Sequence, residues 1–163
     1  MLISSALVKA LNKQIANEFG ASLQYVSIAA YFQQRHLSML SKLFFDQAAE
    51  EREHAMKLVK YVVDAKGALE IPAIPAAKPT FTSAEEAAQA AFDWELEVTK
   101  QINGLMAIAA KENDYLAQGF LQWFVGEQLE EVTKMERILS AIKQSGERNL
   151  LMVEAYLVHI EKS

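Results

Sequence analysis

The stretch AAEEREHAMKL, residues 48–58, places three glutamates and a histidine close together in an otherwise apolar, alanine-rich segment. Carboxylate oxygens and an imidazole nitrogen are ligands for iron, manganese and zinc when they converge in a protein interior. On the surface of a helix the same residues would form only a solvated charged face. The distinction depends on which of these side chains point inward.

Helical phase shows which of these charged residues point inward, because an α-helix repeats every 3.6 residues. The apolar face that begins at Leu40 carries polar residues at its centre, which are Gln47, Glu51 and His54. Glu51 and His54 therefore lie one turn apart on the inward face. Glu50 lies on the flank of that face.

The same anomaly recurs on three other predicted helices, whose apolar faces contain Glu18 with Tyr25, Glu95, and Glu131. The interval of 33 residues from Glu18 to Glu51 recurs from Glu95 to Gln128. The interval of 36 residues from Glu18 to His54 recurs from Glu95 to Glu131. The two halves thus resemble a degenerate internal repeat, in which each half supplies one glutamate and a pair of potential ligands three residues apart.

Four inward carboxylates require a counter-charge, because burying an unpaired ionised carboxylate costs several kcal/mol. The inward faces carry no obvious cation; only Lys134 comes close in phase, and it lies a turn away from Glu131. A metal ion is the remaining counter-charge. Oxygen ligands with one imidazole suit iron or manganese, with zinc as an adventitious substitute, and bridging carboxylates can hold two such ions.

The elements that must position these residues are predicted to be helices at 5–35, 39–66, 84–112, 115–144 and 149–161. Ser38 is expected to cap the second helix and Gly67 to end it, while Ser83 and Glu86 form a capping box for the third. Residues 68–82, with three prolines, form the one long connection. This pattern predicts an all-α fold, a four-helix bundle over 5–144 with one long crossover and a short fifth helix.

Composition narrows the functional classes. The 163 residues suit one domain over 1–163, and a net charge of −5 without a basic block makes nucleic acid an improbable partner. No apolar run reaches the ~20 residues of a membrane span, so no membrane association is expected. The lack of cysteine and of a signal-peptide pattern favours a reducing, cytoplasmic location.

Taken together, seven residues resemble the ferroxidase centre of microbial non-haem ferritins: Glu18, Tyr25, Glu51, His54, Glu95, Gln128 and Glu131. The resemblance covers the whole chain. It implies one iron at Glu18, Glu51 and His54, and a second at Glu51, Glu95 and Glu131 with Gln128 close by. It also implies a third, looser iron site, formed by Glu50, Glu127 and Glu130. Similar proteins oxidise Fe(II) with dioxygen or peroxide and store ferric mineral in a hollow shell of twenty-four subunits.

Differences from three related families support the resemblance to non-haem ferritins. Bacterioferritins ligate haem through a methionine whose position is taken here by Arg52, so no haem is expected. They also require a histidine near 130 or 131, where this chain has glutamates. Rubrerythrins carry a cysteine-ligated iron, and this chain has no cysteine. Small DNA-protecting cages use a histidine on the first helix, whereas His36 stands only at the end of that helix.

Some residues allow a second interpretation. The five main ligands could instead form a hydrogen-bonded polar core, and Glu50, Glu127 and Glu130 could be a solvated acidic face. Tyr25 and Trp123 could donate electrons to an oxygen intermediate or could simply pack, and packing is favoured.

The last segment, NLLMVEAYLVHIEKS, is apolar nearly all round, which predicts a homo-oligomer unless the segment packs back onto its own bundle. Two other functions remain open at this point. One is a bundle that binds metal or partners without catalysis, as an inactive cage subunit would. The other is a di-iron oxidase that acts on an organic substrate.

Overall fold

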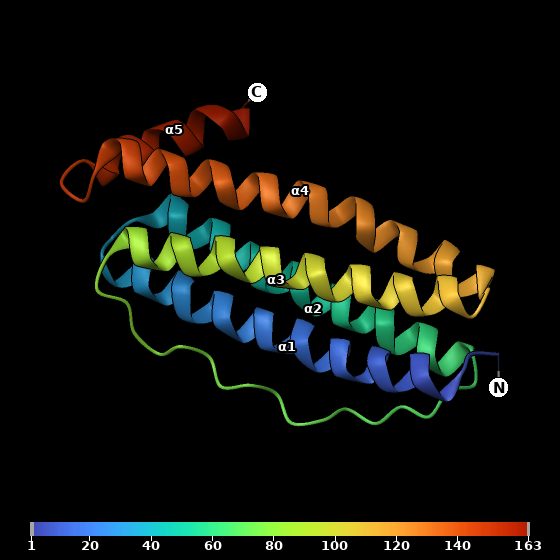
Figure 1. The fold of residues 1–163 in the computed structure, drawn as a ribbon. Helices are drawn as coiled ribbons and strands as arrows, with labels where there is room; N and C mark the ends of the chain where they lie inside the picture. Colours follow the sequence, from blue (N-terminus) through green and yellow to red (C-terminus); the bar gives the residue numbers. More distant parts are fainter. Residues whose placement is uncertain (1, 163) are drawn as a thin grey trace.

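A computed structural model describes residues 2–162 and contains five α-helices within them (Figure 1). They are α1 (Ser5–Gln34), α2 (Ser38–Asp64), α3 (Ala84–Lys111), α4 (Tyr115–Ser145) and α5 (Leu150–Lys162). The predicted boundaries agree within two residues, and the four-helix bundle with a short fifth helix is confirmed. No β-strand occurs in residues 2–162. None of the helices in this range is long and apolar enough to cross a membrane.

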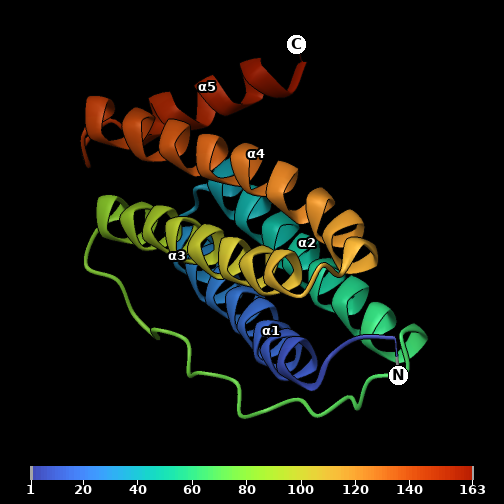
Figure 2. The same ribbon diagram turned by 45° about the vertical axis from the view of Figure 1, so that its right-hand side comes forward.

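The bundle consists of two helix pairs, α1 with α2 and α3 with α4, joined by the long crossover predicted at 68–82. The crossover runs back along the outer side of α1 (Figures 1 and 2). Side chains of α1 hold it there: Asn12 donates to the carbonyl of Ala68, and Gln24 and Ser27 both donate to the carbonyl of Lys78. The crossover is thereby fixed along its length, so α3 can begin at the same end of the bundle as α2.

Helix ends follow the sequence signals except at the two ends of α2. The capping box at the start of α3 is present, since the Ser83 hydroxyl accepts a hydrogen bond from the Glu86 amide at 3.0 Å. At the end of α2, however, the left-handed residue is Lys66 (φ 63°) and not Gly67. Gly67 stands at a close approach, because a Cβ there would lie 2.9 Å from Cγ2 of Val8, so a side chain would force one of the two to shift.

The prediction that Ser38 caps α2 is wrong, because Ser38 is already the first helical residue and Leu37 at the cap position offers no side-chain hydrogen bond. The cap comes instead from α5. Both carboxylate oxygens of Glu154 accept from the first turn of α2, one from the amide of Met39 at 3.0 Å and one from that of Leu40 at 2.8 Å. A carboxylate at this end also interacts favourably with the helix dipole.

Replacing Glu154 with glutamine should therefore lower the free energy of unfolding by about 1 kcal/mol, the usual cost of losing a helix cap. Glutamine keeps the shape but offers only one acceptor oxygen and no charge. Denaturant titration measures the change. Glu161→Gln is the matched control on α5, since the ion pair of Glu161 with Lys42 is exposed and worth little. Equal stability of the two variants would show that Glu154 does not act as a cap.

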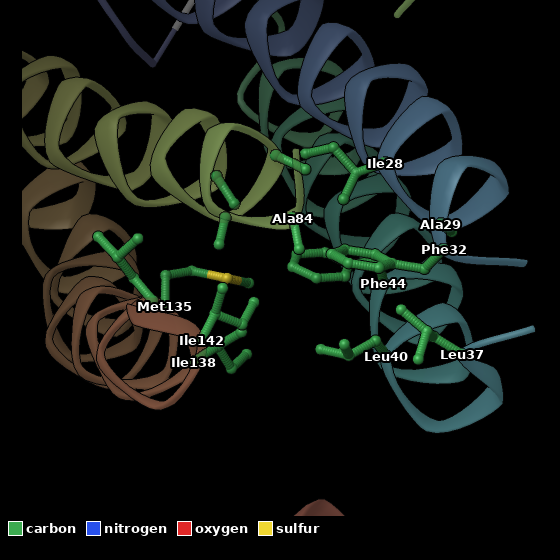
Figure 3. Packing of buried hydrophobic residues seen from close by; sticks show 14 of the residues in the cluster. Ile28, Ala29, Phe32, Leu37, Leu40, Phe44, Ala84, Met135, Ile138 and Ile142 are labelled. Atoms are coloured by element: carbon green, nitrogen blue, oxygen red, sulfur yellow. The ribbon is translucent and has the colours of Figure 1, made fainter. Parts of the chain in front are cut away.

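Two apolar clusters fill the bundle, one toward each end. In the first, the rings of Phe32 and Phe44 stack at a centroid distance of 5.5 Å, and Met135 and Ile138 of α4 lie on the opposite side of the cluster (Figure 3). The second contains, among others, Leu11, Ile15, Leu58, Ile102 and Leu121. On each of the four long helices the inward polar residues lie between these clusters, and they form a polar layer in the middle of the bundle.

The fifth helix packs onto its own bundle with one face and leaves its other face exposed. Leu150, Val153 and Leu157 are buried in the first cluster, and α5 contacts α2 and α4. Its outer face remains open, with Leu151 74% and Met152 68% exposed. Packing onto the chain's own bundle thus accounts for one face of α5 and leaves an apolar face for a partner.

Candidate metal centre

The polar layer contains the six side chains predicted to surround the two main metal positions. Glu18 of α1, Glu51 and His54 of α2, Glu95 of α3, and Gln128 and Glu131 of α4 are all buried, with exposures between 1% and 5%. Glu53, in contrast, is exposed. These inward glutamates are therefore not part of a solvated face, and the helix phase derived from the sequence is correct.

Within residues 2–162 the carboxylates and the imidazole form three groups of potential ligands, and two of them adjoin at Glu51. One consists of Glu18, Glu51 and His54, and the other of Glu51, Glu95 and Glu131. Within each group the ligand atoms lie within 4.8 Å of one another. Because Glu51 belongs to both groups, its two oxygens can bridge two cations. Of these two groups, the first contains an imidazole, whose Nδ1 lies 3.2 Å from Oε2 of Glu51.

Two glutamines that the sequence analysis did not assign to the site orient these carboxylates. Gln14 donates to Oε1 of Glu18 at 2.8 Å. Gln47 donates to Oε1 of Glu51 at 2.7 Å and to Oε2 of Glu131 at 2.8 Å, and so links α2 to α4. Both glutamines stand four residues before the glutamate on their own helix, and this spacing is a signal by which the sequence could have indicated them.

Tyr25 and Gln128 surround Glu95. The Tyr25 hydroxyl donates to Oε1 of Glu95, and the Gln128 amide donates to Oε2 of Glu95 and to the Thr99 hydroxyl, both at 3.2 Å. Burial, followed by the charge of Glu95, raises the pKa of Tyr25 well above its ordinary value. Tyr25 therefore remains a hydrogen-bond donor. Its ring also packs against Phe44 at a centroid distance of 6.0 Å, as the packing interpretation expects.

Burial and mutual repulsion make it unfavourable for all of the carboxylates to be ionised. Burial, followed by the charge of Glu51, raises the pKa of Glu18 well above normal and that of Glu95 to about 8. Burial also raises the pKa of Glu131 to about 7, although the nearby Lys134 acts against it. For Glu51 burial is outweighed by the hydrogen bond and charge of His54, which lower its pKa.

These properties fit a cation site. Oε2 of Glu18 is buried and has no hydrogen-bond partner within residues 2–162, so it is available as a ligand. Metal cations would supply the positive charge that allows Glu18, Glu95 and Glu131 to ionise at neutral pH. Carboxylate oxygens with one imidazole nitrogen match the preference of iron and manganese.

Lys134, the basic residue that the sequence places close in phase, does reach the carboxylates. The Lys134 ammonium lies 3.2 Å from Oε2 of Glu131, 3.3 Å from Oε2 of Glu50 and 2.7 Å from Oε1 of Gln47. Lys134 stands three residues after Glu131, and its long side chain points back over the preceding turn of α4, as side chains on helices do. A single ammonium still leaves several carboxylates without counter-charge.

Glu50, Glu127 and Glu130, the residues predicted for a third site, do not form one group of potential ligands within residues 2–162. Glu50 and Glu130 are exposed, whereas Glu127 is half-buried, with Oε2 3.8 Å from Nε2 of His54. Within the described part of the chain, the group of potential ligands that includes Glu127 is completed by His54 and Glu131.

Trp123 lies beside the centre but not in it. Its ring meets that of His54 edge to face at 5.4 Å, and Nζ of Lys57 lies 3.5 Å from the centroid of the indole. Trp123 is 40% exposed, so its indole extends from the side of the centre to the protein surface.

Comparison with known proteins identifies the family. Residues 8–145 match the model of the ferritin-like domain. The chain is 41% identical to ferritin BfrB of Mycobacterium tuberculosis over 147 residues, which cover 90% of this chain and 81% of that protein. It is 33% identical to bacterial non-heme ferritin of Staphylococcus aureus over 146 residues, which cover 90% and 88%.

Solved structures show the same relationship. An open pore ferritin from the archaeon Archaeoglobus fulgidus aligns with a TM-score of 0.90 and 34% identity, covering 95% of this chain and 96% of the other. A structure described as a humanized archaeal ferritin aligns with a TM-score of 0.91 at 34% identity, covering 95% of each chain. By sequence and by fold, the chain therefore belongs to the ferritin family and is similar to its microbial non-haem members.

Proposed function

We propose that this protein oxidises Fe(II) to Fe(III) at the two adjoining ligand groups and stores the ferric product in a shell of identical subunits. The observation that carries this proposal is the sharing of Glu51 between two buried groups of iron-type ligands in the middle of a ferritin bundle. Iron is here the substrate and the cargo, and no haem takes part.

Two iron positions suit the electron balance of the reaction. Each Fe(II) gives up one electron, and the reduction of dioxygen to hydrogen peroxide takes two electrons and two protons. Peroxide as the oxidant likewise takes two electrons and two protons and yields two molecules of water. Because burial raises the pKa of Glu18 and Glu95, their carboxyl groups hold protons that bound iron would displace.

The shell is proposed from the open face of α5 together with the ferritin relatives. Leu151, Met152 and the half-exposed Tyr156 offer an apolar surface on a helix that already docks on its own bundle. A homo-oligomer with closed symmetry, of twenty-four subunits, would cover this surface. We place this assembly in the cytoplasm.

Aerobic addition of Fe(II) followed by size-exclusion chromatography tests the function. The expected result is oxidation much faster than in protein-free buffer, with iron eluting together with a large oligomer. Oxidation at the buffer rate would contradict ferroxidase activity. Iron that remains at two ions per subunit, whatever amount is added, would contradict storage.

The two iron positions are expected to fill in order. The group with His54 offers an imidazole, which favours Fe(II), whereas the group with Glu95 and Glu131 offers carboxylates, which favour Fe(III). Anaerobic crystals soaked at limiting Fe(II) should therefore show anomalous density first beside His54, and only at higher iron beside Glu95 and Glu131.

Equal occupancy of both positions at every iron level, with no loss of iron on oxidation, would contradict this order. That outcome would favour a permanently held di-iron cofactor. The protein would then be an oxidase of organic substrates and not a storage protein.

A further inference from the structure

Lys134 stands where the buried centre opens toward the surface between α2 and α4. Its side chain is 35% exposed, and it joins the buried Glu131, 2% exposed, to Glu50, which is 49% exposed. The third contact is the side-chain oxygen of Gln47 at 2.7 Å. Three oxygens from two helices thus surround one ammonium group, as they would surround a small cation.

These contacts restrict the oxygens that are left for metal binding. Oε2 of Glu131 receives both the Lys134 ammonium at 3.2 Å and the Gln47 amide at 2.8 Å. The ammonium also fixes the orientation of the Gln47 amide, whose oxygen faces Lys134 while its nitrogen faces Glu51 and Glu131. A protonated lysine has no lone pair, so it cannot itself act as a ligand.

We propose that Lys134 takes the place of a third metal ion at the outer side of the centre and thereby limits each subunit to two iron ions there. This inference rests on the ferroxidase function proposed above. A divalent ion between Glu50 and Glu131 would need the oxygens that the ammonium occupies and would lie next to a positive charge. Lys134 is thus a residue that determines how many ions the centre takes.

The same contacts affect the second iron position. An ion held by Glu51, Glu95 and Glu131 competes with the ammonium for Glu131. Removing the ammonium should accordingly strengthen binding at this position, by about tenfold or more for a charge so close to a buried ligand. Binding beside Glu18 and His54 should change little, because neither residue contacts Lys134.

Zinc is a suitable probe because it binds carboxylate and imidazole ligands without redox chemistry. The metal-free protein and its Lys134→Met variant are titrated with Zn(II) in a calorimeter, and zinc-soaked crystals of both are measured at the zinc absorption edge. The wild type should hold two zinc ions per centre. The variant should hold a third, between Glu50 and Glu131, and should bind the second more tightly.

Two further variants separate charge from packing. Lys134→Arg keeps the charge and should remain at two ions. Lys143→Met removes a lysine from the same helix that donates a hydrogen bond to Gln89, and should also remain at two. Should Lys134→Met not fold, Lys134→Gln carries the same expectation of a third ion.

Two ions in both the wild type and Lys134→Met, or three already in the wild type, would overturn the role of Lys134 and leave the ferroxidase proposal intact. A wild-type centre without zinc beside Glu18 and His54 would overturn the proposed function. It would also overturn the role of Lys134, which rests on that function.

Discussion

Replacing Glu51 with glutamine should slow rapid Fe(II) oxidation by well over tenfold, which corresponds to more than about 1.4 kcal/mol of additional barrier. Glu51 is the one residue shared by the groups that contain Glu18 and His54 on one side and Glu95 and Glu131 on the other. Glutamine keeps the volume and one acceptor oxygen for Gln47 but removes the charge. It would also place an amide nitrogen where the second oxygen should bind metal.

The rate is measured by stopped-flow absorbance with no more than two Fe(II) per subunit in aerobic buffer. Under this condition slow mineral growth contributes little. Glu53→Gln, an exposed change two residues away on α2, is the matched control and should keep the wild-type rate. Wild-type oxidation by a folded Glu51→Gln variant would exclude the centre as the site of reaction.

The metal-free protein should become less stable as pH rises from about 5 to about 8, and Glu95→Gln should remove much of this loss. The folded-state pKa of Glu95 is about 8, against 4.5 as its ordinary value. The folded protein therefore binds more protons than the unfolded chain in this range, and the free energy of unfolding falls as pH rises. Glu131, with a pKa of about 7, acts in the same direction.

The contribution of Glu95 is on the order of 2–5 kcal/mol at pH 8, since one pKa unit corresponds to about 1.4 kcal/mol. Hydrogen bonding to Glu51, together with nearby carboxylates, outweighs burial and raises the pKa of His54, and the stability it contributes is likewise lost as pH rises. Glu51 has a lowered pKa and acts in the opposite direction, but in a more acidic range, below its ordinary value of 4.5. Glu95, Glu131 and His54, together with Glu18, whose pKa is also raised, thus determine the slope near neutrality.

Chelator-treated protein, unfolded with denaturant at several pH values and one protein concentration, gives this slope. Glu97→Gln, an exposed change on the same helix, should leave the slope unchanged. Adding a divalent metal should restore stability at pH 8 by mass action, because the ion binds only the folded centre. A wild-type protein whose stability is constant from pH 5 to 8 would contradict the raised pKa of Glu95.

Periodic features of the sequence predicted most of the fold and the inward set of ligands. Long helices with a sustained 3.6-residue pattern leave little freedom of phase, so the inward position of Glu18, Glu51, Glu95 and Glu131 could be derived. The sequence also placed Gln47 on the inward face of its helix. Its hydrogen bonds to Glu51 and Glu131 could not be predicted, because hydrogen bonding between helices depends on side-chain conformation.

Features that arise from contacts distant in the sequence could not be predicted. The cap of α2 comes from Glu154, more than a hundred residues away, so a local rule chose Ser38 instead. Lys134 is close in phase, but its contacts with Glu50 and Gln47 on α2 depend on the conformation of its long side chain. The end of α2 was assigned to Gly67 from its usual role at helix ends, whereas the close approach of Val8 explains that glycine.

The cap by Glu154 has a consequence for synthesis of the chain on the ribosome. The hydrogen bonds to Met39 and Leu40 join residues 115 and 114 positions apart, so they close a loop over most of the protein. Such a loop carries a large entropic cost and can close only after the last helix has emerged. Until α5 has been synthesised and has docked, the first turn of α2, on the helix that carries Glu51 and His54, therefore lacks these two hydrogen bonds.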